Sequence, residues 1–120
     1  MRVVNVVEDH IEIVLTGLAK AGALQGRIEI PYANIARVDD HLVVPHHMLR
    51  LGGTSLGPIQ EGHFESAGLW YFLSFEHPDR VVTIQLKDFR LGRHPYQAVA
   101  VGAENPAGLK AEIDVHLHHT

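Results

Sequence analysis

The stretch from Leu49 to Phe75 constrains the fold most, because closely spaced glycines and most of the aromatic residues of the chain fall within it. Glycines at such intervals are typical of a backbone that reverses direction repeatedly. The pair Ala67-Gly68 predicts a tight turn that joins His63–Ser66 to Trp70–Phe75 as a β-hairpin. Because the second segment is rich in aromatic side chains, we expect this hairpin to lie in the middle of a β core.

Short apolar or alternating segments on either side of this stretch predict further β-strands. In the clearest case, Ile11, Ile13 and Leu15 recur at every second position, so one face of that strand is expected to lie against a core. The other predicted strands are Met1–Val7, Arg27–Ile30, Ile35–Val38, Val81–Leu86 and Tyr96–Val101.

The segments between the predicted strands differ in character. The alanine-rich segment Leu18–Leu24 predicts one or two helical turns, since its residues are mostly unbranched. The glycine-rich residues Gly52–Gly62 are expected to form a structural connection, and Lys87–Pro95 a charged loop. The segment His41–Met48 is ambiguous, because Pro45 argues against a central strand there.

The end of the sequence predicts an amphipathic helix. Asn105 followed by Pro106 is a strong helix start, because asparagine caps the first turn and proline is tolerated at the first helical position. Leu109, Ile113 and Leu117 recur every four residues and form one apolar stripe, which must pack against another element.

Together these elements predict a mainly β protein, either an antiparallel sandwich or a partly open barrel of about seven or eight strands, capped by a C-terminal α-helix. Residues 1–120 are expected to form a single domain. Cysteine is absent, which excludes disulfides and thiolate metal sites. The first residues do not resemble a signal peptide, and no apolar run approaches the roughly 20 residues of a membrane span, so we expect a cytoplasmic protein.

This order of elements resembles the bacterial pleckstrin-homology-like domain proteins. The residues that carry the likeness are IEIPYANIARV (28–38), LGGTSLGPIQEGHF (51–64), HPDRVVTIQL (77–86) and AVAVGAENPAGL (98–109). The resemblance implies an antiparallel β fold with a capping helix and a non-enzymatic module that binds proteins or membranes or self-associates. The chain departs from the lipid-binding members, because the loop between its first two strands, Glu8-Asp9-His10, is acidic and would repel a phosphate.

The charged loop at residues 87–94 is the candidate binding site. Lys87, Arg90 and Arg93 flank the apolar residue Phe89, so the cations could attract anionic lipid headgroups while Phe89 inserts as an apolar tip. The same cations could equally well contact an acidic groove of a partner protein. The alternative is a solvated loop in which Phe89 packs back onto the core.

No catalytic residues, cofactor or metal site are predicted. His46-His47 and the histidines at 116, 118 and 119 form clusters without the three or four convergent ligands that a tetrahedral site needs. Serines lie outside a nucleophile-elbow context, and the glycine-rich segment lacks the spacing and lysine of a phosphate-binding loop. Glu61 and Glu65 are expected to be solvated rather than to form an acid–base pair.

We therefore expect a non-catalytic binding or assembly module that contacts a protein partner or a second copy of itself as a homo-oligomer. An incompletely closed sheet would offer exposed strand edges for such contacts. The alternative function is a peripheral membrane adaptor that binds anionic headgroups through the loop at 87–94. Nucleic acid is disfavoured as a partner, because the net charge is −4.

Overall fold

The computed structural model describes the backbone and side chains of residues 2–15, 26–45, 59–91 and 94–117, and the backbone of residues 49–56. This part of the chain is mainly β, with one α-helix near the C-terminal end. The elements are β1 (Arg2–Val6), β2 (His10–Leu15), β3 (Arg27–Pro31), the 3-10 helix η1 (Tyr32–Asn34), β4 (Ile35–Asp39), β5 (Leu49–Leu56), β6 (Ile59–Ser66), β7 (Leu69–Phe75), β8 (Val81–Leu86), β9 (Arg90–Leu91), β10 (His94–Gly102) and α2 (Pro106–Leu117).

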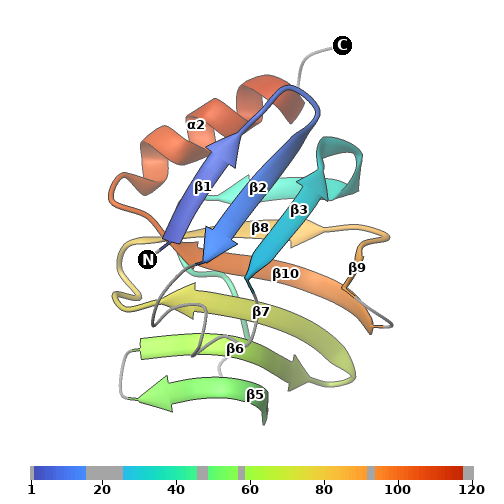
Figure 1. Cartoon of the computed structure of the whole chain (residues 1–120), viewed down its shortest axis with the longest axis vertical. Helices are drawn as coiled ribbons and strands as arrows, with labels where there is room; N and C mark the ends of the chain where they lie inside the picture. Colours follow the sequence, from blue (N-terminus) through green and yellow to red (C-terminus); the bar gives the residue numbers. More distant parts are fainter. Residues whose placement is uncertain (1, 16–25, 46–48, 57–58, 92–93, 118–120) are drawn as a thin grey trace.

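The strands form two sheets. The smaller sheet has the antiparallel order β1-β2-β3, and the larger has the order β4-β8-β10-β7-β6-β5, with β9 pairing with β10 beside this path. The smaller sheet crosses one face of the larger, and α2 lies next to it (Figure 1). Neither sheet closes into a barrel among the described strands, which leaves β4 and β5 as the outer strands of the larger sheet.

The main core fills the space between the two sheets and α2. In β2, Ile11, Ile13 and Leu15 are almost completely buried while their neighbours are partly exposed, as the sequence alternation predicts. These side chains meet buried residues of the larger sheet, including Phe72 of β7 and Val99 of β10. The alternation of apolar residues therefore holds the two layers together.

A second apolar cluster lies on the opposite face of the larger sheet. It contains Tyr71, Leu73 and Phe75 from β7, which alternate with residues of the main core. Leu42 and Val44 pack against this second cluster from the segment that follows β4. A strand that is buried on both faces belongs in the middle of a sheet, and β7 takes that place.

The hairpin predicted around Ala67-Gly68 is confirmed. β6 and β7 pair in antiparallel register from Gln60 opposite Phe75 to Ser66 opposite Leu69. Both turn residues have positive φ, 54° and 84°, which is the geometry of the two-residue turn that matches the twist of a hairpin.

The glycine-rich segment was predicted to be a connection, and that prediction is wrong. Gly52 and Gly53 lie within β5, and Gly62 lies within β6 directly opposite Gly53. Glycines at these intervals predict turns, but here Gly53 and Gly62 face each other within the paired strands β5 and β6. The pairing of the two strands decides the local structure, rather than the glycine spacing. The predicted helical turns at Leu18–Leu24 lie outside the described residues.

A purely antiparallel arrangement was also predicted, and β10 departs from it. This strand is inserted between β7 and β8, where it runs parallel to β7 and antiparallel to β8. Since β7 and β8 run in opposite directions, any strand placed between them must be parallel to one of the two. Local patterns in the sequence carry no information on such an insertion.

The predicted C-terminal helix is confirmed. The backbone N–H of Gly108 donates to Oδ1 of Asn105 at 3.1 Å, so Asn105 caps the first turn as expected. Ile113 is completely buried in the main core, and Leu109 and Leu117 pack against it. Through this stripe α2 lies over β4, β8 and η1.

A buried polar network joins β1 to the larger sheet, and it contains Glu61, so the prediction that this side chain is solvated is wrong. Arg2 donates from Nε to Oγ of Ser74 at 2.8 Å and from Nη2 to Oε1 of Glu61 at 2.7 Å, and it also forms an ion pair with Glu76. Ser74 donates to the second oxygen of Glu61 at 2.7 Å. Burial raises the pKa of Glu61, whereas the hydrogen bond from Arg2 lowers the pKa of Glu76.

Candidate binding groove

Strand β4 forms one outer edge of the larger sheet. Among the described strands it pairs with β8 alone, with Arg37 opposite Gln85, Val38 opposite Ile84 and Asp39 opposite Thr83. The register shifts between Ile35 and Arg37, so the regular part of the strand is the run from Arg37 to Asp39. The other edge of β4 therefore offers backbone groups that can pair with an additional strand.

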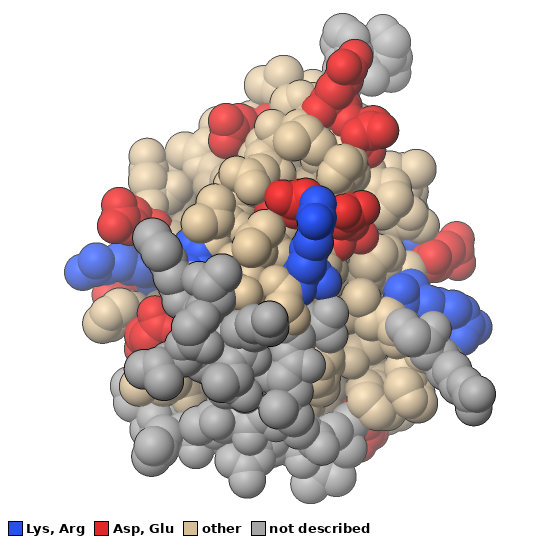
Figure 2. All heavy atoms as spheres, viewed as in Figure 1, with Lys and Arg blue, Asp and Glu red and all other residues tan. Residues whose placement is uncertain are grey.

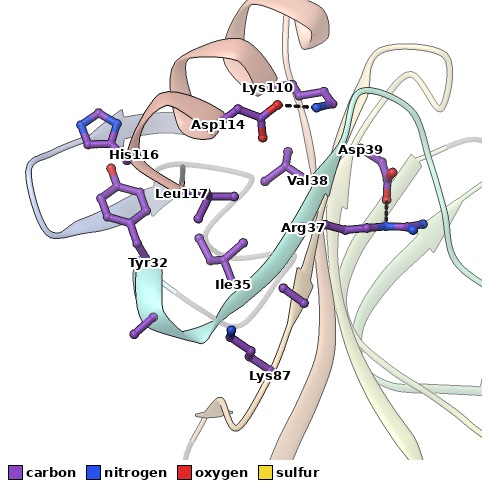
Figure 3. A pocket seen from close by; sticks show the side chains of 12 residues that line it. Tyr32, Ile35, Arg37, Val38, Asp39, Lys87, Lys110, Asp114, His116 and Leu117 are labelled. Atoms are coloured by element: carbon purple, nitrogen blue, oxygen red, sulfur yellow. Dashed lines mark hydrogen bonds and ion pairs between the residues drawn. The ribbon is translucent and has the colours of Figure 1, made fainter. Parts of the chain in front are cut away.

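A groove with a volume of about 650 Å³ runs between this edge strand and α2 (Figure 3). We call it the β4–α2 groove. One wall comes from η1 and β4, the other from the part of α2 between Lys110 and Leu117, and Lys87 stands at one end. The lining residues are Tyr32, Ala33, Ile35, Ala36, Arg37, Val38, Asp39, Lys87, Lys110, Asp114, His116 and Leu117.

The floor of the groove is apolar. Ile35 and Val38 are buried, Leu117 is half-buried, and their side chains occupy the space between strand and helix (Figure 3). Ala33 and Ala36 are exposed and carry only methyl groups. These two small side chains on the side of η1 and β4 leave room for a narrow occupant above the apolar floor.

Charged side chains surround this floor. Lys110 and Asp114 form an ion pair one helical turn apart, and the hydrogen bond from Lys110 to that carboxylate raises the pKa of Lys110. Arg37 lies 3.4 Å from Asp39 on the edge strand, between Nε and Oδ2. Lys87 is exposed and has no ion-pair partner among the described residues, so the lining carries one positive charge in excess.

Two local contacts fix the end of the groove where β4 begins. The rings of Tyr32 and His116 stack with their centroids 4.8 Å apart, and the Tyr32 hydroxyl donates to the carbonyl oxygen of Val7. Asn34 donates from Nδ2 to the carbonyl oxygen of Lys87 at 3.1 Å and accepts from the Lys87 backbone N–H at 2.8 Å. The backbone at Lys87 is therefore held beside η1.

The described residues of the predicted basic site lie in different surroundings. Lys87 lines the β4–α2 groove, and Arg90 is exposed in β9. Phe89 is only 8% exposed and belongs to the main core, which corrects its predicted role as an inserting apolar tip. Arg93 lies outside the described residues. Binding by this loop stays a prediction, now without its apolar component.

The sequence did not reveal the groove, because its walls come from residues 32–39 and 110–117. The only local signals were the short strand at Ile35–Val38 and the apolar stripe of the helix, and both are explained equally well by core packing. What makes the groove is the position of β4 at the edge of its sheet, which is a long-range property.

Titratable clusters elsewhere are occupied by structural contacts. His10, Glu12 and Glu29 on the smaller sheet bring their ligand atoms within 4.8 Å of one another, but Arg27 forms ion pairs with both carboxylates. Glu65 accepts a hydrogen bond from the backbone N–H of Gly68 at 2.7 Å in the hairpin turn. These side chains stabilise their own strands.

His63 and Tyr96 form a partly buried pair at the side of the main core. The Tyr96 hydroxyl lies 2.6 Å from Nδ1 of His63. Burial lowers the pKa of His63 and raises the pKa of Tyr96 to about 12. At neutral pH the phenol therefore keeps its proton and the imidazole is uncharged.

This pair predicts a loss of stability in acid. Because the pKa of His63 is lower in the folded than in the unfolded state, the unfolded chain takes up the proton first as the pH falls below about 6.5. His63→Gln keeps a hydrogen-bonding group for Tyr96 but does not titrate, so its unfolding free energy should fall less between about pH 7.5 and about pH 5.5. Urea unfolding of both proteins across this range measures the difference, and equal slopes would contradict the assignment.

Comparison of the chain with protein-family models, with curated proteins and with solved structures finds no match. Among the described residues, no helix has the length and apolar character needed to cross a membrane. The function must therefore be inferred from the groove itself.

Proposed function

We propose that the chain is a non-catalytic protein-binding module with a pleckstrin-homology-like architecture, and that its β4–α2 groove receives an extended segment of a partner chain as an added strand. The observation that carries the proposal is that the edge strand β4 lines the groove along its whole length. The mainly β fold and the helix packed over the larger sheet support the architecture, from which the parallel pairing of β7 and β10 departs.

The groove has the two properties that strand addition needs. Backbone groups of an edge strand supply hydrogen bonds that are independent of sequence, and pockets for alternate side chains supply selectivity. Here the apolar floor of Ile35, Val38 and Leu117 would take every second side chain of the occupant. The charged rim would contact the side chains that point away from the floor.

Membrane binding is the second candidate function, and Phe89 weighs against it. With this side chain in the core, a membrane would be held by cations alone, and the described loop offers Lys87 and Arg90. Stable attachment by charge generally needs a cluster of four or more Lys and Arg. On the face shown in Figure 2, cations lie singly among acidic groups rather than gathered in one patch.

Selection from a random peptide library displayed on phage tests the proposal. Peptides that bind the wild-type chain should lose affinity at least about tenfold, or about 1.4 kcal/mol, for Ala36→Tyr, which fills the groove at an exposed position. Ala111→Tyr places the same ring on an exposed helical position outside the groove and serves as the matched control. NMR shifts caused by a selected peptide should map to residues 35–39 and 110–117.

Shifts that map elsewhere, or an equal loss for both tyrosine variants, would contradict strand addition at β4. Flotation with phosphatidylserine vesicles at low and at physiological salt tests the second function in parallel. Salt-sensitive recovery that disappears in Lys87→Glu would favour the membrane adaptor over the protein-binding module.

A further inference from the structure

We infer that the partner segment is β4 of a second copy of this chain, paired antiparallel with β4 about a two-fold axis that passes beside Val38. The inference rests on the proposed function, because it names the occupant of the same groove. It extends the larger sheet across two molecules and makes the contact isologous, with the same strand contributed by each copy.

The register follows from the regular part of the strand. The shift between Ile35 and Arg37 leaves Arg37–Asp39 as the run that keeps an unbroken ladder, and Val38 is its centre. When the axis is perpendicular to the sheet, the residue on the axis lies opposite the same residue of the other copy. The residue before it in one copy then lies opposite the residue after it in the other copy. A two-fold axis at Val38 therefore places Arg37 of each copy directly opposite Asp39 of the other.

Charge selects this register over its neighbours. An axis at Arg37 would place two guanidinium groups opposite each other, and an axis at Asp39 would oppose two carboxylates. Directly opposed side chains share a face, with Cβ atoms about 4.5–5.5 Å apart, so opposite charges stabilise the pairing and like charges weaken it. The Val38 register alone among the three forms two symmetry-related ion pairs.

The two charged side chains of this run lie on the same side of the strand, 3.4 Å apart, but differ in exposure: Arg37 is 66% exposed and Asp39 is 16% exposed. Asp39 also accepts a hydrogen bond from Nε2 of Gln85 at 3.4 Å, so in the dimer it would keep this contact and exchange Arg37 of its own chain for Arg37 of the other copy. An edge strand that is protected against pairing commonly carries Lys or other charges that repel a second copy. β4 instead carries one charge of each sign, which is self-complementary.

The groove provides space for the second strand. Neighbouring strands lie about 4.8 Å apart, so an added strand needs space directly beside β4. The groove, with a volume of about 650 Å³, borders every residue of β4 on the side of α2. The helix of the second copy would lie on the same face, across the two-fold axis.

Charge reversal tests the pairing. Sedimentation equilibrium should show a concentration-dependent dimer for the wild type, and Arg37→Asp and Asp39→Arg should each raise its dissociation constant at least about tenfold. An equimolar mixture of the two variants should dimerise again, because one copy then carries two acids and the other two bases at positions 37 and 39. Arg80→Asp and Asp79→Arg are matched reversals at exposed positions of the turn before β8 and should change nothing.

Disulfide trapping gives a second measurement with uncharged variants. The chain has no cysteine, so Arg37→Cys and Asp39→Cys each introduce a single thiol. Opposed positions in a sheet match the Cβ separation of a disulfide, about 3.5–4.5 Å, more closely than diagonal ones. A mixture of the two variants should cross-link on mild oxidation much faster than either variant alone.

The outcomes separate this inference from the proposed function. A wild type that stays monomeric, or a dimer that ignores charge reversal and gives no preferential cross-linking in the mixture, overturns the β4–β4 pairing. If groove-dependent peptides are still selected in that case, strand addition by a different partner stands. If they are not, both proposals fall.

Discussion

Arg2→Leu should lower the free energy of unfolding by about 3–5 kcal/mol, because it leaves a buried carboxylate without its cation. The side chains of Arg2 and Glu61 are 11% and 7% exposed, and the pair connects β1 to β6 of the larger sheet. Most small domains are stable by only about 5–15 kcal/mol, so this change would remove a large share of the total.

A double variant distinguishes the effect of losing the ion pair from the cost of leaving the buried carboxylate of Glu61 unpaired. Arg2→Leu/Glu61→Leu should recover part of the loss, since replacing both members of a buried pair by apolar residues removes the unpaired carboxylate. Arg27→Leu is the exposed control, because Arg27 is 60% exposed in its ion pair with Glu12 and such pairs contribute at most about 1 kcal/mol. Urea unfolding followed by circular dichroism measures all four proteins. Equal losses for the two single variants would contradict the role of burial.

Ile113→Ala should cost about 2–5 kcal/mol and should also disable the groove. Ile113 is completely buried where α2 meets the main core, so its truncation leaves a cavity beneath the helix that forms one wall of the groove. We therefore expect both a lower thermal unfolding midpoint and weaker dimerisation or peptide binding from the same substitution.

The matched control for Ile113 lies two residues further along the same helix. Val115 is 67% exposed, and Val115→Ala should change stability by no more than about 0.5 kcal/mol. Dimerisation that survives in Ile113→Ala at temperatures where the variant is folded would show that α2 is not needed to shape the binding surface.

The sequence predicted correctly the start of the helix, the hairpin turn and the buried face of β2, each of which depends on residues close together in the chain. The Asn105 cap fixes the start of α2, and positive φ at Ala67-Gly68 fixes the β6–β7 turn, because both depend on residues within a few positions. The alternation in β2 likewise predicted which side chains lie inside.

Long-range pairing decided what the sequence could not reveal. The glycines at 52 and 53 look like turn residues until a facing strand is known, and the sequence left open whether Phe89 forms an exposed tip or packs onto the core. The groove belongs to the same class, since β4 becomes an edge only through the order of the whole sheet. Lys87 was singled out for its charge, but its place beside η1 depends on Asn34.

The insertion of β10 between β7 and β8 has a consequence for biosynthesis. Until residues 94–102 have left the ribosome, β7 and β8 each have an unpaired edge where β10 will later lie. The buried side chains of β10 are then missing from the apolar clusters on both faces of the sheet. Of the described strands, the one that joins the two halves of the larger sheet is thus translated after all the others. The larger sheet can be completed only once β10 has been made, and until then its unpaired strand edges and apolar surface favour aggregation.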